Sequence, residues 1–123
     1  MITVDLDAVA ANSATLVAVA DGAALCAVVK ADGYGHGSVG VARAALAGGA
    51  TWLAVALVEE GRVLREAGIE VPILVLSEPP PDAMAEALDA ELTPTLYTLD
   101  GVASAARAVA ARPGTAPWAV HLK

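Results

Sequence analysis

A regular alternation of short apolar runs with longer amphipathic segments constrains this chain more than any other feature. Runs of aliphatic and β-branched residues predict strands, and segments with apolar residues at helical spacing predict helices. Because a parallel crossover needs about a dozen residues or more, this alternation implies parallel strands. The predicted strands cover residues 25–30, 51–56, 72–76, 92–96 and 118–123, and the predicted helices cover 38–47, 58–67, 82–90 and 99–111.

Two architectures share this alternation, a doubly wound sheet and part of a (β/α)8 barrel. Residues 3–20 predict a short strand and then a helix that starts near Asp5 or Asp7. Pro94 counts against a central position for the fourth strand, because proline lacks a backbone N–H. A complete barrel takes about 250 residues. We therefore interpret this chain of 123 residues as part of a longer protein.

The charge and hydropathy of the chain exclude several classes of partner. The net charge of −7 argues against nucleic-acid binding and against docking on anionic lipid, which both need a basic surface. The longest uncharged stretch, residues 44–58, is shorter than the about 20 residues of a membrane-spanning helix. No signal peptide is visible, so we expect a cytoplasmic protein. The single cysteine, Cys26, is expected to be a small buried residue.

The two lysines of the chain, Lys30 and Lys123, each end a predicted strand, whereas the five other basic residues are arginines. A lysine can lose its proton when desolvated and then act as a nucleophile or base, which an arginine cannot. Catalytic side chains of parallel α/β folds gather at the carboxyl ends of strands. Lys30 is therefore a candidate catalytic residue. The alternative is a lysine that extends from the strand end into solvent.

Residues 30–37, Lys-Ala-Asp-Gly-Tyr-Gly-His-Gly, place three glycines, a tyrosine and a histidine directly after the first predicted strand. The glycines permit positive φ. The segment is not a dinucleotide fingerprint, because Ser38 stands where the third glycine should be, and it is not a P-loop, because the lysine precedes the glycines. Ser38 is expected to be the N-cap of the next helix. The alternative for the segment is a tight strand-to-helix turn, with Tyr34 as a surface aromatic and His36 as a turn residue.

The segment Ala-Val-Val-Lys-Ala-Asp-Gly-Tyr-Gly-His-Gly, residues 27–37, closely resembles the pyridoxal phosphate (PLP) attachment motif of bacterial alanine racemases. The resemblance covers essentially the whole chain. It implies an α/β fold in which residues 1–123 are the N-terminal part of a TIM-type (β/α)8 barrel, with the rest of the barrel and a β-rich domain absent. Further segments similar to the family follow in order: 4–9 with Asn12, 49–50 with 52–56, Glu59, 64–65, Gly68, 72–76 and 120–123.

The resemblance also implies roles for individual residues. Lys30 would hold PLP as a Schiff base and act as one of two catalytic bases, and Tyr34 would hydrogen-bond the PLP phosphate. Leu76 would line the cofactor pocket. Lys123 matches a lysine that is carbamylated in many members. The second base of the family is a tyrosine from the partner subunit, which implies a homodimer, and no metal is expected.

The function implied by the resemblance is interconversion of L- and D-alanine by the full-length protein, which supplies D-alanine for peptidoglycan. The 123 residues alone are expected to be inactive. Two alternatives remain open, a PLP-binding barrel protein of cofactor homeostasis and a racemase for serine or other amino acids. Residues 34–37 favour a racemase, because homeostasis proteins and amino-acid decarboxylases of this barrel type usually lack them.

Overall fold

The structure is a computed structural model that describes residues 1–112, 114 and 117–123. The strands of this part of the chain are β1 (Cys26–Val28), β2 (Trp52–Val55), β3 (Ile73–Val75), β4 (Thr93–Leu96) and β5 (His121–Leu122). Its helices are α1 (Leu6–Val19), α2 (Lys30–Gly35), α3 (Ser38–Ala47), α4 (Val58–Glu66), α5 (Met84–Asp89) and α6 (Leu99–Ala110). The predicted alternation is confirmed. The short strand expected ahead of α1 is wrong, because residues 1–5 lie in no strand.

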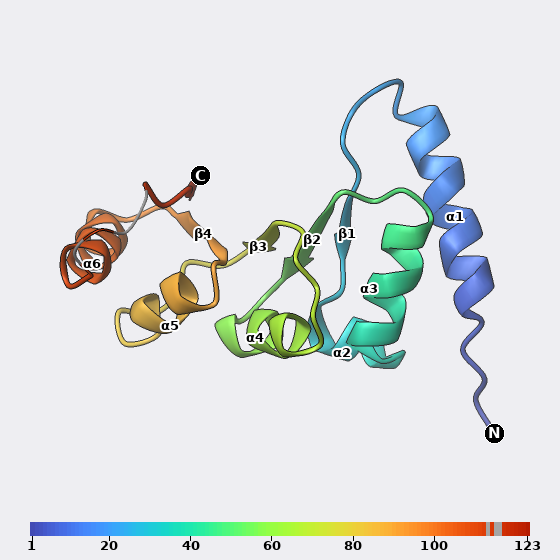
Figure 1. The fold of residues 1–123 in the computed structure, drawn as a ribbon, viewed down its shortest axis with the longest axis horizontal. Helices are drawn as coiled ribbons and strands as arrows, with labels where there is room; N and C mark the ends of the chain where they lie inside the picture. Colours follow the sequence, from blue (N-terminus) through green and yellow to red (C-terminus); the bar gives the residue numbers. More distant parts are fainter. Residues whose placement is uncertain (113, 115–116) are drawn as a thin grey trace.

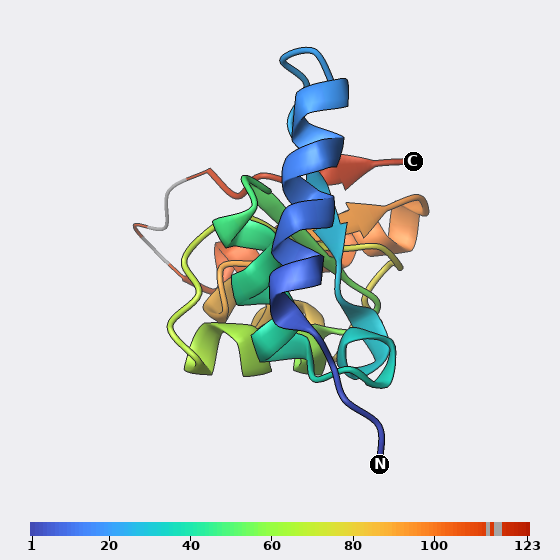
Figure 2. The ribbon, with the colours of Figure 1, turned by 90° about the vertical axis from the view of Figure 1, so that its right-hand side faces the viewer.

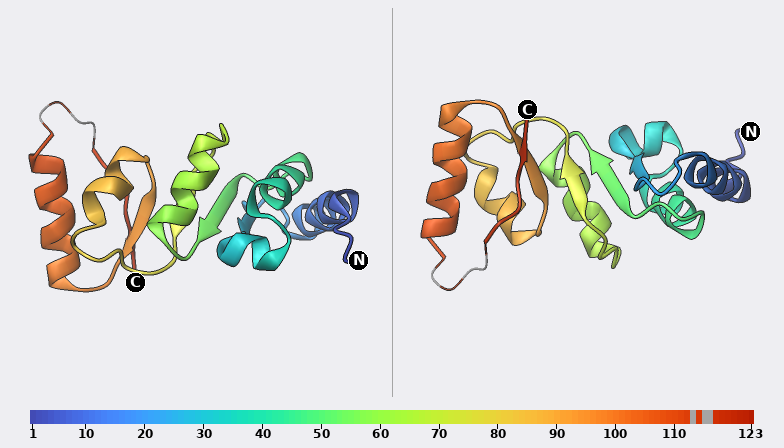
Figure 3. Two further views of the ribbon diagram at one scale, coloured as in Figure 1. Left: turned by 90° about the horizontal axis from the view of Figure 1, so that it is seen from below. Right: turned by 90° about the horizontal axis from the view of Figure 1, so that it is seen from above.

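All five strands form one parallel sheet in the order β1-β2-β3-β4-β5. Sequential parallel strands joined by right-handed crossovers place every connecting helix on the same face of the sheet. A doubly wound sheet would instead reverse its strand order. The elements follow one another across the molecule, from α1 at one end to α6 at the other (Figures 1 and 3). The fold is therefore part of a (β/α)8 barrel, as expected.

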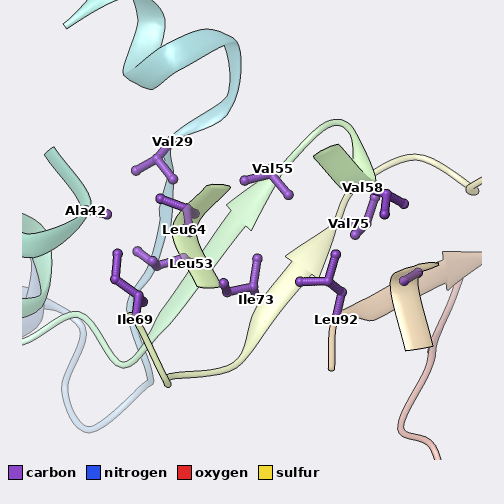
Figure 4. Packing of buried hydrophobic residues seen from close by; sticks show 11 residues of the cluster. Val29, Ala42, Leu53, Val55, Val58, Leu64, Ile69, Ile73, Val75 and Leu92 are labelled. Carbon is purple, nitrogen blue, oxygen red and sulfur yellow. The ribbon is translucent and has the colours of Figure 1, made fainter. Parts of the chain in front are cut away.

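The hydrophobic core lies between the sheet and the helices that cover it. Leu53 and Val55 of β2 are in register with Ile73 and Val75 of β3, and all four side chains are buried. Leu64 of α4 packs in the same cluster (Figure 4). Alternate residues of a strand point to opposite faces, so these side chains point to the helices and their neighbours point to the other face.

The other face of β1 is open. Ala27 packs against the core, whereas Cys26 and Val28 on either side of it are exposed. The expectation of a buried Cys26 is therefore wrong. The physical reason is that β1 is the edge strand of the described sheet and that no described element covers Cys26 and Val28 on its second face.

Pro94 lies in a central strand, contrary to the sequence-based expectation. β4 pairs with β3 through Val75 and Pro94, and it pairs with β5 on its other side through Thr95 and His121. The pairing with β5 begins one residue after the proline. The ladder between β4 and β5 therefore does not need the N–H that Pro94 lacks.

Helix α1 begins where the sequence predicted. Asp5 is its N-cap, and Oδ1 of Asp5 accepts a hydrogen bond of 3.0 Å from the backbone N–H of Ala8. The helix packs against α3 on the outside of the molecule (Figure 2). Within residues 1–112, 114 and 117–123, no helix combines the length and the apolar character needed to cross a bilayer.

Candidate functional site

Lys30 opens a left-handed turn directly after β1. Ala31, Asp32, Gly33 and Tyr34 have φ of 52°, 52°, 62° and 56° and ψ of 50°, 48°, 38° and 38°, so α2 is not a right-handed helix. A left-handed conformation costs a residue with a Cβ about 1–2 kcal/mol. The glycines predicted positive φ in this segment, but they did not predict it at the three other residues. Such a run persists only where surrounding contacts hold it.

Contacts on both sides of Lys30 hold this turn in place. The N–H of Val29 donates to the carbonyl of Ala54 in β2 at 2.8 Å, and the N–H of Ala31 donates to Oε1 of Glu60 at 2.7 Å. Within the turn, the N–H of Gly33 donates to the carbonyl of Val29 at 2.9 Å. The backbone around Lys30 is therefore attached to β2 and α4 as well as to its own strand.

Asp32 connects the left-handed turn to α3. Its Oδ1 accepts a 2.8 Å hydrogen bond from the N–H of Ser38, the first residue of α3. The expected N-cap role of Ser38 is wrong, because Gly37 occupies the cap position and makes no side-chain bond there. Instead, the carboxylate of Asp32, six residues upstream, accepts the hydrogen bond at the start of α3, because the turn folds it back over this end of the helix.

Glu60 links two neighbouring strand-to-helix turns. Its Oε2 accepts hydrogen bonds from the N–H groups of Ala56 at 2.8 Å and Leu57 at 3.1 Å, and its Oε1 reaches Ala31. The left-handed turn α2 lies beside α4 in the fold (Figure 1). Sequence reasoning missed Glu60. The available signal was a glutamate at the third position of a helix, which is typical of N-terminal capping.

The two predicted groups of the turn have no competing partners. Lys30 is partly buried, and the side chain of Tyr34 is exposed. Neither the Lys30 amine nor the Tyr34 hydroxyl makes a hydrogen bond or ion pair with another described residue. His36 lies on the same segment, with Nδ1 3.0 Å from the carbonyl oxygen of Gly33. The turn therefore presents an amine and a phenol, four residues apart, at the carboxyl edge of the sheet.

Leu76 and Lys123 lie together at a second place on this edge. With Ser77 and Tyr97 they line a shallow pocket of about 300 Å³ beyond the carboxyl ends of β3, β4 and β5. The backbone N–H of Lys123 donates to the carbonyl of Leu96 at 3.1 Å, which extends the strand pairing to Lys123. Lys30 and Tyr34 do not line this pocket. The sequence-predicted residues thus share one edge of the sheet but form two groups.

The lysine at this edge of the sheet is suited to amine chemistry. In the part of the chain that the structure describes, no group of three or more His, Cys, Asp or Glu side chains could hold a metal ion. An uncommitted lysine at the carboxyl end of a barrel strand can form a covalent bond with a carbonyl group.

Comparison with known proteins gives one consistent family. A model described as the alanine racemase N-terminal domain matches residues 4–123. The alanine racemase of Thermobifida fusca is 50% identical over 107 residues, which are 85% of this chain and 29% of that protein. The alanine racemase of Frankia casuarinae is 48% identical over 120 residues, which are 98% of this chain and 31% of that protein.

Solved structures agree with these sequences. Alanine racemase from Streptomyces coelicolor matches with a TM-score of 0.84 and 39% identity, over 97% of this chain and 32% of that one. Alanine racemase from Bacillus anthracis matches with a TM-score of 0.83 and 38% identity, over 96% of this chain and 30% of that one. The chain spans about a third of the length of the relatives it matches. With its barrel topology and a family match over residues 4–123, the chain belongs to the alanine racemase family, to its N-terminal domain.

Proposed function

We propose that residues 1–123 are the amino-terminal part of the barrel of a PLP-dependent alanine racemase, whose complete chain interconverts L- and D-alanine. The observation that carries this proposal is the position of Lys30, at the carboxyl edge of the sheet with an amine that no described residue engages. The complete protein would be a cytoplasmic homodimer that supplies D-alanine for peptidoglycan. The rest of the barrel and a β-rich domain would follow Lys123.

The residues of the turn fit PLP, which carries an aldehyde and a phosphate. The amine of Lys30 would bind the aldehyde carbon covalently, and the exposed hydroxyl of Tyr34 would donate a hydrogen bond to the phosphate. Leu76, which lies at the same edge of the sheet, would line the cofactor pocket. Lys123 would be carbamylated and would orient an arginine further along the chain.

The chemistry divides between the cofactor and the protein. Bound PLP withdraws electrons from the α-carbon of the amino acid, so that the proton on this carbon becomes acidic. Nζ of Lys30 would move that proton on one face of the α-carbon. Racemisation needs a second acid–base group on the opposite face, which a tyrosine of the partner subunit would supply. The 123 residues alone would therefore not racemise alanine.

Ligands of the relatives support an amino acid as the substrate. The Bacillus anthracis protein was solved with bound L-Ala-P, and a Clostridium difficile alanine racemase was solved in complex with cycloserine. Whether the substrate is alanine, serine or another amino acid depends on its side chain, so the test must compare several amino acids.

The test uses the complete native protein and two variants, Lys30→Ala and Lys30→Arg. Borohydride reduction followed by peptide mapping should find PLP attached to Lys30 in the wild type and to no residue in either variant. Racemisation of L-alanine, measured by chiral chromatography, should fall at least about a hundredfold in both variants, as expected on loss of a catalytic base. Lys30→Arg keeps the positive charge but cannot attach PLP, so it separates the effect of losing the charge from the effect of losing the attachment.

Three results would contradict parts of this proposal. Attachment of PLP at Lys123, or turnover by Lys30→Arg at the wild-type rate, would refute the role of Lys30. PLP attachment without racemisation of any amino acid would instead indicate a cofactor-homeostasis protein. Racemisation of serine in preference to alanine would correct the substrate and leave the chemistry intact.

A further inference from the structure

We propose that Glu60 is a positioning residue for Lys30, acting through the backbone of the left-handed turn. This inference rests on the proposed function of Lys30, but the hydrogen bonds that carry it stand on the geometry alone. Glu60 is partly buried in the first turn of α4, 30 residues after the lysine in the chain. One carboxylate there accepts from three backbone N–H groups, at 2.7, 2.8 and 3.1 Å.

The bond from Ala31 controls the peptide unit that directly follows Lys30. That N–H donates to Oε1 of Glu60, while the residue before the lysine, Val29, donates its N–H to Ala54 of β2. Both backbone bonds that flank Lys30 therefore end on the unit formed by β2 and α4. The direction of the lysine side chain depends on this anchoring, because the Cα–Cβ bond of Lys30 is fixed by the two peptides beside it.

The strain of the turn makes this anchor necessary. Ala31 is the first residue of the left-handed run, and no glycine relieves its conformation. A bond to an ionised carboxylate is roughly twice as strong as a bond between neutral groups. Oε2 meanwhile holds the N–H groups of Ala56 and Leu57, so that the carboxylate cannot swing freely away from Ala31. We infer that Glu60 keeps the turn, and with it the amine, in one position.

Two substitutions separate this role from simple capping of α4. Glu60→Asp keeps the negative charge at the start of α4 and can still accept from Leu57, but it is one methylene too short to bridge both turns. Glu60→Gln keeps the length but turns an NH2 group toward a donor. Glu59→Gln is the matched control, because Glu59 lies beside Glu60 in the same helical turn, is exposed and makes no hydrogen bond with a described residue.

The experiment uses the complete native protein purified without PLP. Amide hydrogen exchange, followed by mass spectrometry, should be at least about tenfold faster in the segment 30–35 of Glu60→Asp and Glu60→Gln than in wild type or Glu59→Gln. PLP is then added, and its attachment to Lys30 is followed by absorbance. Attachment should be about 10- to 100-fold slower in both Glu60 variants, since a misplacement of about 1 Å can cost about a hundredfold in rate.

Each outcome decides the inference. Wild-type exchange and attachment rates in a folded Glu60→Asp would overturn it, as would equal slowing in Glu59→Gln. If Glu60→Gln fails to fold, the result for Glu60→Asp decides whether Glu60 positions Lys30. If both variants fail to fold, Glu60 has a role in stability alone, and the inference is overturned. Absence of PLP attachment to Lys30 in the wild type would refute the proposed function, while the exchange arm would still decide whether Glu60 holds the turn.

Discussion

The hydroxyl of Thr98 donates a 2.6 Å hydrogen bond to Oε1 of Glu78, which joins the segment after β3 to the start of α6. Oε2 of the same carboxylate accepts from the N–H groups of Tyr97 at 2.7 Å and Thr98 at 2.9 Å. The Thr98 hydroxyl is the largest of the causes that hold the pKa of Glu78 below its usual value, and the Tyr97 N–H follows it. Glu78 thus ties two strand-to-helix turns together, as Glu60 does.

We predict that Glu78→Gln destabilises the native protein in a pH-dependent manner. The pKa of Glu78 is lower in the folded state than its unfolded value of about 4.3. Its contribution to stability is therefore fully present above that pH and is lost as the pH falls through the folded-state pKa. Urea unfolding from pH 3 to 7 should show a higher free energy of unfolding for wild type than for the variant. This difference should narrow only at the acidic end of the range. Glu59→Gln, which removes one negative charge from an exposed residue that makes no hydrogen bond with a described residue, is the control.

Arg65 gives a second prediction. Its guanidinium donates to the carbonyls of Ile69 at 2.7 Å, Val71 at 2.8 Å, Ala90 at 3.0 Å and Glu91 at 3.1 Å, and burial lowers the pKa of this group. A lysine ammonium cannot span four carbonyls, so Arg65→Lys should lower the free energy of unfolding by about 1–3 kcal/mol.

The control for Arg65 lies on the same helix. Arg62 is exposed, and among the described residues it pairs only with surface glutamates, Glu66 at 3.0 Å and Glu86 at 3.1 Å. Arg62→Lys should therefore change stability by no more than about 0.5 kcal/mol. Equal losses in the two variants would show that the bonds of Arg65 to the carbonyls contribute little.

Local sequence patterns were sufficient to predict the helices and strands, but not the contacts between segments that are far apart in the sequence. The helix that begins at Asp5 was predictable because its N-cap acts over three residues. The hydrogen bonds of Arg65 were not predictable from such patterns, because the carbonyls of Ala90 and Glu91 are supplied by a segment 25 and 26 residues away. The exposure of Cys26 likewise depends on whether another element covers β1, which no local pattern encodes.

The candidate site was predictable to the same extent. The strand-end positions of Lys30 and Lys123 follow from the pattern of apolar runs, and the structure places both at the carboxyl edge of the sheet. The left-handed turn was not predictable, because alanine and tyrosine rarely adopt positive φ and do so here under contacts from distant segments. The anchor at Glu60 lies 29 residues from Ala31, so its hydrogen bond depends on the sheet order.

Gly61 of α4 should be intolerant of a side chain. A Cβ there would lie 2.7 Å from Cδ1 and 2.8 Å from Cδ2 of Leu92, which is fully buried in the core. We expect Gly61→Ala to lower the free energy of unfolding by about 1–3 kcal/mol, as overpacking does. Gly40→Ala in α3 is the control, because its Cβ would meet only Leu6 at 3.5 Å, and it should stabilise by up to about 1 kcal/mol. Thermal melting of both variants tests this prediction, because Gly61→Ala should lower the melting temperature and Gly40→Ala should not.

Ala31 should show the opposite response to glycine from an alanine in a right-handed helix. Its φ of 52° and ψ of 50° carry the left-handed penalty of about 1–2 kcal/mol, which glycine removes at some entropic cost in the unfolded chain. We expect Ala31→Gly to raise the free energy of unfolding by about 0.5–1 kcal/mol.

The same substitution in a right-handed helix provides the control for Ala31. Ala11 is exposed in the interior of α1, and Ala11→Gly should lower the free energy of unfolding by about 1 kcal/mol. Ala31→Gly keeps the N–H that donates to Glu60, so attachment of PLP to Lys30 should proceed at the wild-type rate. Stability is measured by urea unfolding of the native protein. If both Ala31→Gly and Ala11→Gly lower the free energy of unfolding, the turn is not left-handed in solution.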